Sequence, residues 1–299
     1  MLTRVNANSP FPTESKLYFP VVERGITFLD KAGDAYPSFR APKHKMLIRS
    51  HPDSGEPVCL SVVGENYKVV PNRDLFPYIE EHLTRVIDDK YLGNVTVHEQ
   101  MSYGGRDCYR EYIFNDLKCD VKQGDVSYRA IVGNSYGNKS VTLLSGAIDG
   151  WCSNGMIFGV HEKNARKHTS GITMRGIASW IDVSIKRFVE HGKRIQTYEA
   201  VQIGPQMEID LFTHLLDKKH MSKHMVKSMI EDMHAEHIKR GRVTQHPSMW
   251  HFYSALTNWA SHADVRDTGN DHEANTRIQR SQHVERMIKA ANDYVKEAA

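Results

Sequence analysis

The chain has 299 residues, of which 40% are hydrophobic and 25% are charged, and its formal net charge at pH 7 is +3. This length suits one large domain or two small ones, and the composition is ordinary for a folded soluble protein. No run of about 18 apolar residues exists, and residues 1–6 lack the apolar segment of a signal peptide. We therefore expect a cytoplasmic protein without a membrane partner.

Residues 1–42 carry five of the 11 prolines and little periodicity. They predict a loosely packed N-terminal arm, with 25–29 as a short packed insertion. Further along the chain, apolar alternation bounded by turn residues predicts strands. The expected strands are 45–49, 58–63, 67–70, 94–103, 108–114, 128–136 and 141–152.

Helical spacing of apolar residues marks the other elements. Asn72 is a good N-cap for a helix that interrupts the strands and ends near Tyr91. After Gly155 the pattern is helical throughout. The expected helices are 172–194, one opened by Pro205, one capped by Ser222, one opened by Pro247, and 274–295.

These elements predict an α+β fold: an antiparallel β-meander with an inserted helix, followed by a helical C-terminal half. The expected division is an N-terminal arm (1–42), an α+β sheet domain (43–160) and a helical region that packs on the sheet (161–299).

Charge is unevenly distributed along the chain. Residues 74–125 hold 11 acidic and 6 basic residues, whereas residues 126–194 hold 10 basic and 4 acidic ones. A second basic cluster covers 40–45 and Arg49. Such separation can build a positive face for nucleic acid, although the same residues can equally form solvated faces that do not converge.

Two segments stand out in the basic region: Asn-Ser-Tyr-Gly-Asn-Lys-Ser at 134–140 and Gly-Trp-Cys-Ser-Asn-Gly-Met at 150–156. They read as two strands joined by a tight polar turn. Asn134, Tyr136 and Lys139 can hydrogen-bond, stack and neutralise phosphate, so we expect them to face a ligand, with Trp151 and Cys152 packed beneath. Any tight hairpin uses the same residue types, and this structural alternative stays open.

The same segments resemble the YafZ-like proteins, an uncharacterised family of phages and conjugative plasmids. Residues 64–72 are similar to that family's G-x-x-Y-x-x-V-x-N segment, and 134–156 to its central hairpin. Residues 250–262 resemble its W-x-x-Y-N-A-x-T-x-x-x-x-H helix, with Ser254 in place of the usual Asn. No activity or catalytic set comes with this resemblance. In broad outline the predicted fold also resembles the Rad52-type strand-annealing proteins, which implies a homo-oligomer.

The function favoured is non-enzymatic binding or annealing of single-stranded DNA, or RNA, for a phage or mobile element. Basic and aromatic residues alternate in Tyr109-Arg110 and Tyr128-Arg129, so each pair faces both sides of a strand and at most one set can line a groove. The alternative is that the tyrosines are half-buried strand residues and the cations solubilise the surface. The expected nucleic-acid-binding residues are Arg129, Asn134, Tyr136, Lys139, Asn154, Lys163, Arg166, Lys167, Arg175, Lys186 and Arg187.

Two other functions remain open from the sequence. One is an interaction protein that binds a host protein through its helical half. The other is a metal-assisted nuclease, which needs converging carboxylates. The adjacent acids at 88–89 and 231–232 diverge by about 100° on a helix.

Metal binding is not predicted. The histidine pairs His220/His224 and His234/His237 each share a helix face, but no HExxH signature or nearby carboxylate completes a ligand set. The four cysteines lack C-x-x-C spacing, which argues against a zinc ribbon. The sequence thus predicts neither a metal nor a cofactor.

Overall fold

The computed structural model of the protein describes residues 10–29, 35–119, 126–137, 139–149, 154–158, 164–169, 171–241, 244–264 and 273–298. Antiparallel sheets fill the N-terminal half and helices the C-terminal half, which confirms the predicted α+β class. The strands are β1 (Val22–Leu29), β2 (Ala35–Ser50), β3 (Pro57–Gly64), β4 (Val95–Ser102), β5 (Asp107–Cys119), β6 (Val126–Ser135), β7 (Val141–Asp149), β8 (Asn154–Phe158) and β9 (Asn164–Arg166). The helices are α1 (Asn72–Val86), α2 (Met174–Ala200), α3 (Pro205–Asp217), α4 (Lys223–Lys239), α5 (Met249–His262) and α6 (Glu273–Ala298). Two short 3₁₀ turns, Asp89–Tyr91 and Tyr103–Gly105, separate α1 from β4 and β4 from β5.

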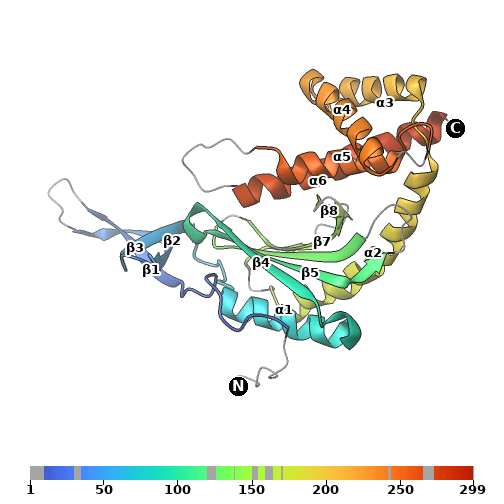
Figure 1. The fold of residues 1–299 in the computed structure, drawn as a ribbon. Coiled ribbons are helices and arrows are strands. Elements are labelled where there is room, and N and C mark those ends of the chain that lie inside the picture. Colours follow the sequence, from blue (N-terminus) through green and yellow to red (C-terminus); the bar gives the residue numbers. More distant parts are fainter. Residues whose placement is uncertain are drawn as a thin grey trace.

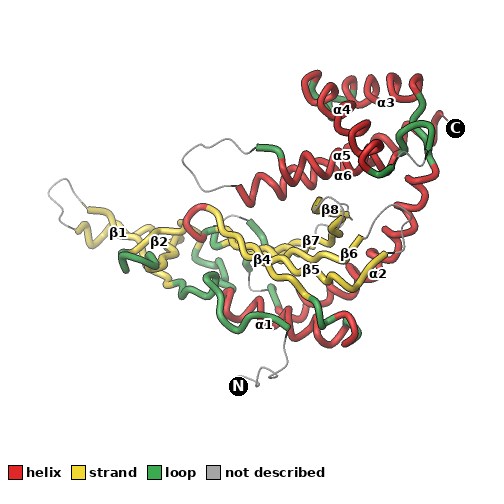
Figure 2. The backbone as a smooth tube through the Cα atoms, viewed as in Figure 1, coloured by secondary structure: helices red, strands yellow, loops and turns green. Residues whose placement is uncertain are grey.

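The larger sheet is a meander. Among the described residues it has six strands in the order β4-β5-β6-β7-β8, with β9 paired to β7, and all pairs are antiparallel. Figures 1 and 2 show α1 and α2 on one side of this sheet and the α5–α6 pair on the other. The sheet therefore has one face packed on α1 and α2 and a second face turned toward α5 and α6.

The smaller sheet corrects the prediction of an N-terminal arm. β1, β2 and β3 form an antiparallel sheet in that order, and β1 and the first half of β2 lie before residue 43. The preceding segment is also packed, because Phe11 and Leu17 are buried. The expected strand 67–70 is likewise wrong, since this stretch is a loop that leads into α1.

The basic cluster at 40–45 and Arg49 is partly absorbed by this sheet. Lys45 pairs with Glu23 at 2.8 Å, and Arg49 is buried with its guanidinium 4.6 Å from the centre of the Phe19 ring. These two cations are therefore engaged with neighbouring side chains.

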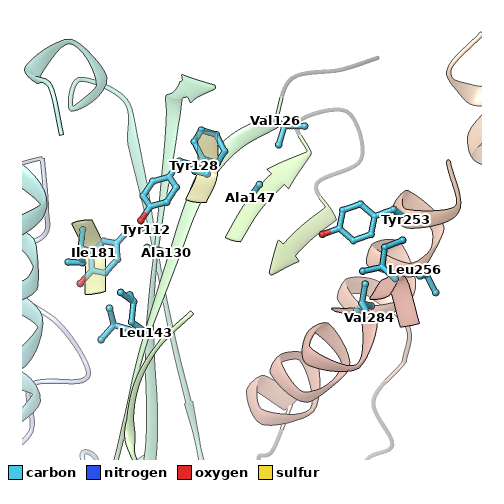
Figure 3. Packing of buried hydrophobic residues seen from close by; sticks show 14 of the residues in the cluster. Tyr112, Val126, Tyr128, Ala130, Leu143, Ala147, Ile181, Tyr253, Leu256 and Val284 are labelled. Carbon is cyan, nitrogen blue, oxygen red and sulfur yellow. The ribbon is translucent and has the colours of Figure 1, made fainter. Parts of the chain in front are cut away.

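The main core lies between the larger sheet and the α1–α2 layer. Tyr112 of β5 and Tyr128 of β6 are both buried on this face of the sheet, and each hydroxyl contacts a helix. The Tyr112 hydroxyl donates to the Glu80 carboxylate of α1 at 3.0 Å, and the Tyr128 hydroxyl is hydrogen-bonded to the Ser184 hydroxyl of α2. Figure 3 shows these rings beside Ile181 on the helix side of the strands. This layer fixes the sheet and thereby the position of its opposite face.

The helices begin where their capping residues predict. Thr173 accepts from the Gly176 N–H at 3.1 Å, Ser222 from the Met225 N–H at 3.2 Å, and Ser248 forms a capping box with His251. In the described part of the chain, no helix is long and apolar enough to cross a membrane.

α2 joins the two halves. Its first turns pack under the sheet, and its last turns contact α5 and α6. There Arg194 lies 3.7 Å from Glu285 of α6, and Asn292 of α6 donates to the Tyr198 hydroxyl at 2.7 Å. These contacts set where α6 lies relative to the sheet.

Candidate functional site

A cleft of about 480 Å³ lies between the second face of the sheet and the α5–α6 pair. Alternate residues of β4, β5 and β6 form its floor, and the end of α5 with the start of α6 forms its roof. The lining residues are His98, Glu99, Gln100, Tyr109, Glu111, Ile113, Arg129, Ile131, Ala260, Ser261, His262, Arg277, Ile278 and Ser281.

The floor combines an aromatic ring with an ion pair. Tyr109 is half-buried and packs beside Ile131, and Ile278 of α6 closes over this small apolar cluster. Two residues further along the same face of β5, Glu111 accepts a hydrogen bond from the Nε of Arg129. The floor thus offers a flat apolar surface next to charge, which suits a ligand that is both aromatic and anionic.

Tyr109 is held by a close backbone approach. A Cβ added at Gly133, directly opposite on β6, would lie 2.6 Å from the Thr142 hydroxyl and 3.0 Å from the Tyr109 ring. Only glycine leaves room for the ring there. Burial raises the pKa of Tyr109 above its usual value, as do Asp107 and other neighbours, so the hydroxyl is a neutral donor.

The roof places a second arginine over the floor. Arg277 of α6 donates to the backbone carbonyl of Ser261 at the end of α5, which ties the two helices together at the cleft. His262, the last residue of α5, lies beside it and is exposed.

The cleft contains more basic than acidic side chains. Glu99 stands directly opposite Arg110, 3.3 Å from its Nε, and this pair belongs to the other face of the sheet. Among the lining residues, Glu111 is then the one carboxylate on the cleft face, against Arg129 and Arg277. The balance favours an anionic ligand.

The structure corrects the expectation that Asn134 and Tyr136 face a ligand. Both are buried, with exposures of 1% and 0%. Asn134 donates to the Val70 carbonyl at 2.8 Å and to the Asn72 side chain at 2.6 Å, while the Tyr136 hydroxyl accepts from the Asn72 N–H at 3.0 Å. Their amide and hydroxyl groups therefore join the end of the larger sheet to the start of α1. Trp151 and Cys152 lie outside the described residues.

Lys139 is more exposed and is paired. Its Nζ lies 2.7 Å from the buried Asp107 carboxylate, and its ammonium is 5.9 Å from the centre of the exposed Tyr103 ring, on which Arg106 stacks at 4.0 Å. Asp107, which binds Lys139, lies two residues before Tyr109 on β5, and Tyr103 and Arg106 lie in the turn that joins β4 to β5. Tyr103, Arg106 and Lys139 thus form a second aromatic and basic group at this end of the sheet.

The other predicted binding residues do not join the cleft where they are described. Arg175 and Lys186 are exposed and Arg187 half-buried on α2, the helix that covers the opposite face of the sheet. Lys167 is exposed in the segment before α2. Lys163 lies outside the described residues, as do the side chains of Asn154 and Arg166. Of the predicted set, only Arg129 is among the lining residues.

The second histidine pair, His234 and His237, has partners within the fold. His234 contacts the Glu208 carboxylate of α3 at 2.7 Å, and His237 contacts the Thr244 carbonyl at 2.9 Å. In the described ranges, no group of three or more His, Cys, Asp or Glu side chains is placed to hold a metal ion.

The sequence motifs explain the frame of the cleft. Tyr67, from the first motif, donates to the Ser135 carbonyl of the central hairpin at 2.6 Å, so these two motifs contact each other. In the C-terminal motif, Trp250 and Tyr253 are fully buried, and Figure 3 shows Tyr253 extending from α5 toward the strands. The motif's final residue, His262, reaches the cleft.

Sequence reasoning missed most of the lining. His98, Glu111 and Arg277 sit in unremarkable surroundings in the chain, whereas His262 ends the C-terminal motif. The alternation of side chains along β6 gives one usable signal. Arg129 is two residues from Ile131 and five from Asn134, so it shares a face of the sheet with Ile131 and not with Asn134.

These observations define an α+β protein with a cleft between an antiparallel sheet and a helical pair. A family model described as a domain of unknown function, DUF932, matches residues 59–289. The match covers most of the chain, including both sides of the cleft, and the protein belongs to this family. No curated protein and no solved structure matches the chain.

Proposed function

We propose that this protein binds single-stranded DNA along the cleft face of the sheet. The observation that carries the proposal is the convergence of Tyr109, Arg129 and Arg277 in one cleft. Proteins that bind single strands combine basic side chains that track the backbone with aromatic rings on which bases stack. Tyr109 supplies the ring, and the two arginines supply positive charge in the same cleft.

The cleft alone is no larger than a small-ligand pocket, since its volume of about 480 Å³ falls in the usual range of 300–1,000 Å³. We expect it to hold a short stretch of the strand. The rest of the strand would continue past Tyr109 to the exposed ring of Tyr103, with Arg106 and Lys139 beside it. Stacking tolerates every base, so we expect little sequence preference.

The resemblance to the YafZ-like proteins supports a further part of the proposal, that the protein serves a phage or mobile element in a bacterial cytoplasm. The resemblance to Rad52-type proteins supports strand annealing by a homo-oligomer. The first part rests on a sequence resemblance and the second on a broad resemblance of the predicted fold, whereas the binding proposal rests on the cleft.

Tyr109→Leu tests the proposal. Leucine keeps an apolar side chain but removes the aromatic face, and loss of one base-stacking contact costs about 1–3 kcal/mol, or roughly 5- to 150-fold in affinity. Fluorescence anisotropy with a labelled 20-nucleotide strand measures this loss, and a thermal melt of each variant checks folding.

Tyr91→Leu is the matched control. Tyr91 is a half-buried tyrosine with Lys90 4.7 Å from its ring centre, and it is not among the lining residues. Equal losses in both variants, or no loss in Tyr109→Leu, would contradict binding in the cleft. A folded protein that binds no oligonucleotide would instead favour a host-protein partner, and Ile209 and Ile238 are the exposed apolar residues of α3 and α4 from which to begin.

A further inference from the structure

We propose that Glu111 is an internal competitor for the phosphate-binding position on Arg129, and that a bound strand displaces its carboxylate toward His98. This inference rests on the proposed function, because it assigns the phosphate site within the same cleft. It makes Glu111 a residue that sets affinity without itself attracting the ligand.

The geometry places the two charges at the centre of the floor. Glu111 and Arg129 stand diagonally on neighbouring strands, since Glu111 is paired with Ile131 and Arg129 with Ile113. Their side chains are 15% and 16% exposed, so the ion pair is partly withdrawn from water but open to the cleft. A ligand that enters the cleft therefore reaches both groups.

A carboxylate and a phosphate compete for the same donors. The planar guanidinium binds either anion through parallel N–H groups, and the carboxylate oxygen already occupies the Nε of Arg129. A phosphate can take this place only if the Glu111 carboxylate leaves, because two anions at one guanidinium repel each other in a partly desolvated site. The exchange replaces one charge-assisted hydrogen bond by another, and no covalent bond forms or breaks.

His98 offers the displaced carboxylate a new partner. It lies directly opposite Glu111 on β4, on the same face, and it is exposed in the cleft. Side chains in directly opposite positions have Cβ atoms about 4.5–5.5 Å apart, within reach of a carboxylate–imidazole contact. Glu111 therefore stands between Arg129 on one neighbouring strand and His98 on the other.

Glu111→Gln is the direct test, with a labelled single-stranded 20-mer as the probe. Removing the competing carboxylate is expected to tighten binding by about tenfold, which corresponds to about 1.4 kcal/mol. It should also steepen the log–log dependence of affinity on salt by about 0.7, because in the wild type the displaced Glu111 carboxylate takes up a cation as the phosphate releases one, and the variant lacks this uptake. A structural role for Glu111 would change the melting temperature but not this slope.

Two further variants make the test specific. Asp116→Asn removes a carboxylate from the exposed end of the same strand, and it should change affinity by less than about twofold and leave the salt slope unaltered. His98→Ala should weaken binding about three- to tenfold in the wild-type background and have no effect in the E111Q background, because the displaced carboxylate is then absent. If E111Q does not fold, His98→Ala alone carries the test, and an unchanged affinity overturns the proposal.

The outcomes separate this proposal from the function on which it rests. Wild-type binding with E111Q equal in affinity and slope overturns the competitor and leaves the function standing. Binding by E111Q at low salt where the wild type binds weakly or not at all supports the competitor. No binding by either protein overturns both.

Discussion

Glu285 should make the protein less stable as the pH rises from 5 to 8. This α6 carboxyl is 7% exposed, and its nearest cation is Arg194, 3.7 Å away. Burial raises the pKa of Glu285 from 4.5 to about 7, against the smaller opposing effect of Arg194. The folded chain thus holds this proton more tightly than the unfolded chain.

The sign of the effect follows from this order of pKa values. The stabilisation is fully present below pH 4.5, where both states are protonated, and it is lost as the pH rises through 7. A pKa raised from 4.5 to about 7 corresponds to roughly 3 kcal/mol, most of which is lost between pH 5 and pH 8. The free energy of unfolding therefore decreases over this interval.

Urea denaturation of the wild type and Glu285→Gln at pH 5 and pH 8 measures the effect. The fall in unfolding free energy should be smaller in the variant by roughly 2–3 kcal/mol. Some fall should persist, because burial also raises the pKa of Glu80 to about 7. Glu190→Gln, which removes an exposed carboxylate from α2, is the control. If the wild type and Glu285→Gln lose the same free energy between the two pH values, the reasoning about Glu285 is refuted.

Three further predictions concern the frame of the cleft. Arg110→Met should destabilise the fold by about 3–5 kcal/mol at pH 8, because Glu80, 2.8 Å away, is left buried without its cation; a loss below 1 kcal/mol in urea titrations would contradict this. Asn134→Ala should lower the free energy of unfolding by about 1–3 kcal/mol, because the Val70 carbonyl loses its donor, and it should leave the affinity for single-stranded DNA unchanged. A fall in this affinity without a change in stability would indicate instead that Asn134 contacts the ligand. Gly133→Ala should lower both the stability and the affinity for single-stranded DNA, because the new methyl group displaces the Tyr109 ring. An unchanged melting temperature would contradict this, because it would show that β5, β6 and β7 shift to make room for the methyl group.

Much of the helical half could be predicted because its signals are local. Ser222 at an N-cap and Pro205 at the first helical position mark helix starts by their own backbone chemistry, and both are confirmed. The alternation of β5 and β6 likewise predicts that Tyr109 and Arg110 face opposite sides, as they do.

What could not be predicted depends on contacts distant in sequence. Alternation does not say which face meets α5 and α6, so it does not distinguish the cleft residue Tyr109 from the buried Arg110. The N-terminal hairpin was missed because Pro37 and Pro42 break the usual strand pattern. They are tolerated in the part of β2 that extends beyond its pairing with β3, where fewer N–H groups are needed. Arg277 joins the cleft only through the packing of α6 on α2 and α5.

All of these binding predictions depend on the proposal that the cleft binds single-stranded DNA through phosphate and base contacts. The most direct measurement is the anisotropy of a labelled single strand titrated with the wild-type protein over a series of salt concentrations. The account predicts binding at low salt that weakens as salt rises, with a log–log slope of about −0.7 for each phosphate neutralised. Affinity that is independent of salt, or no binding at low salt by folded protein, would contradict it.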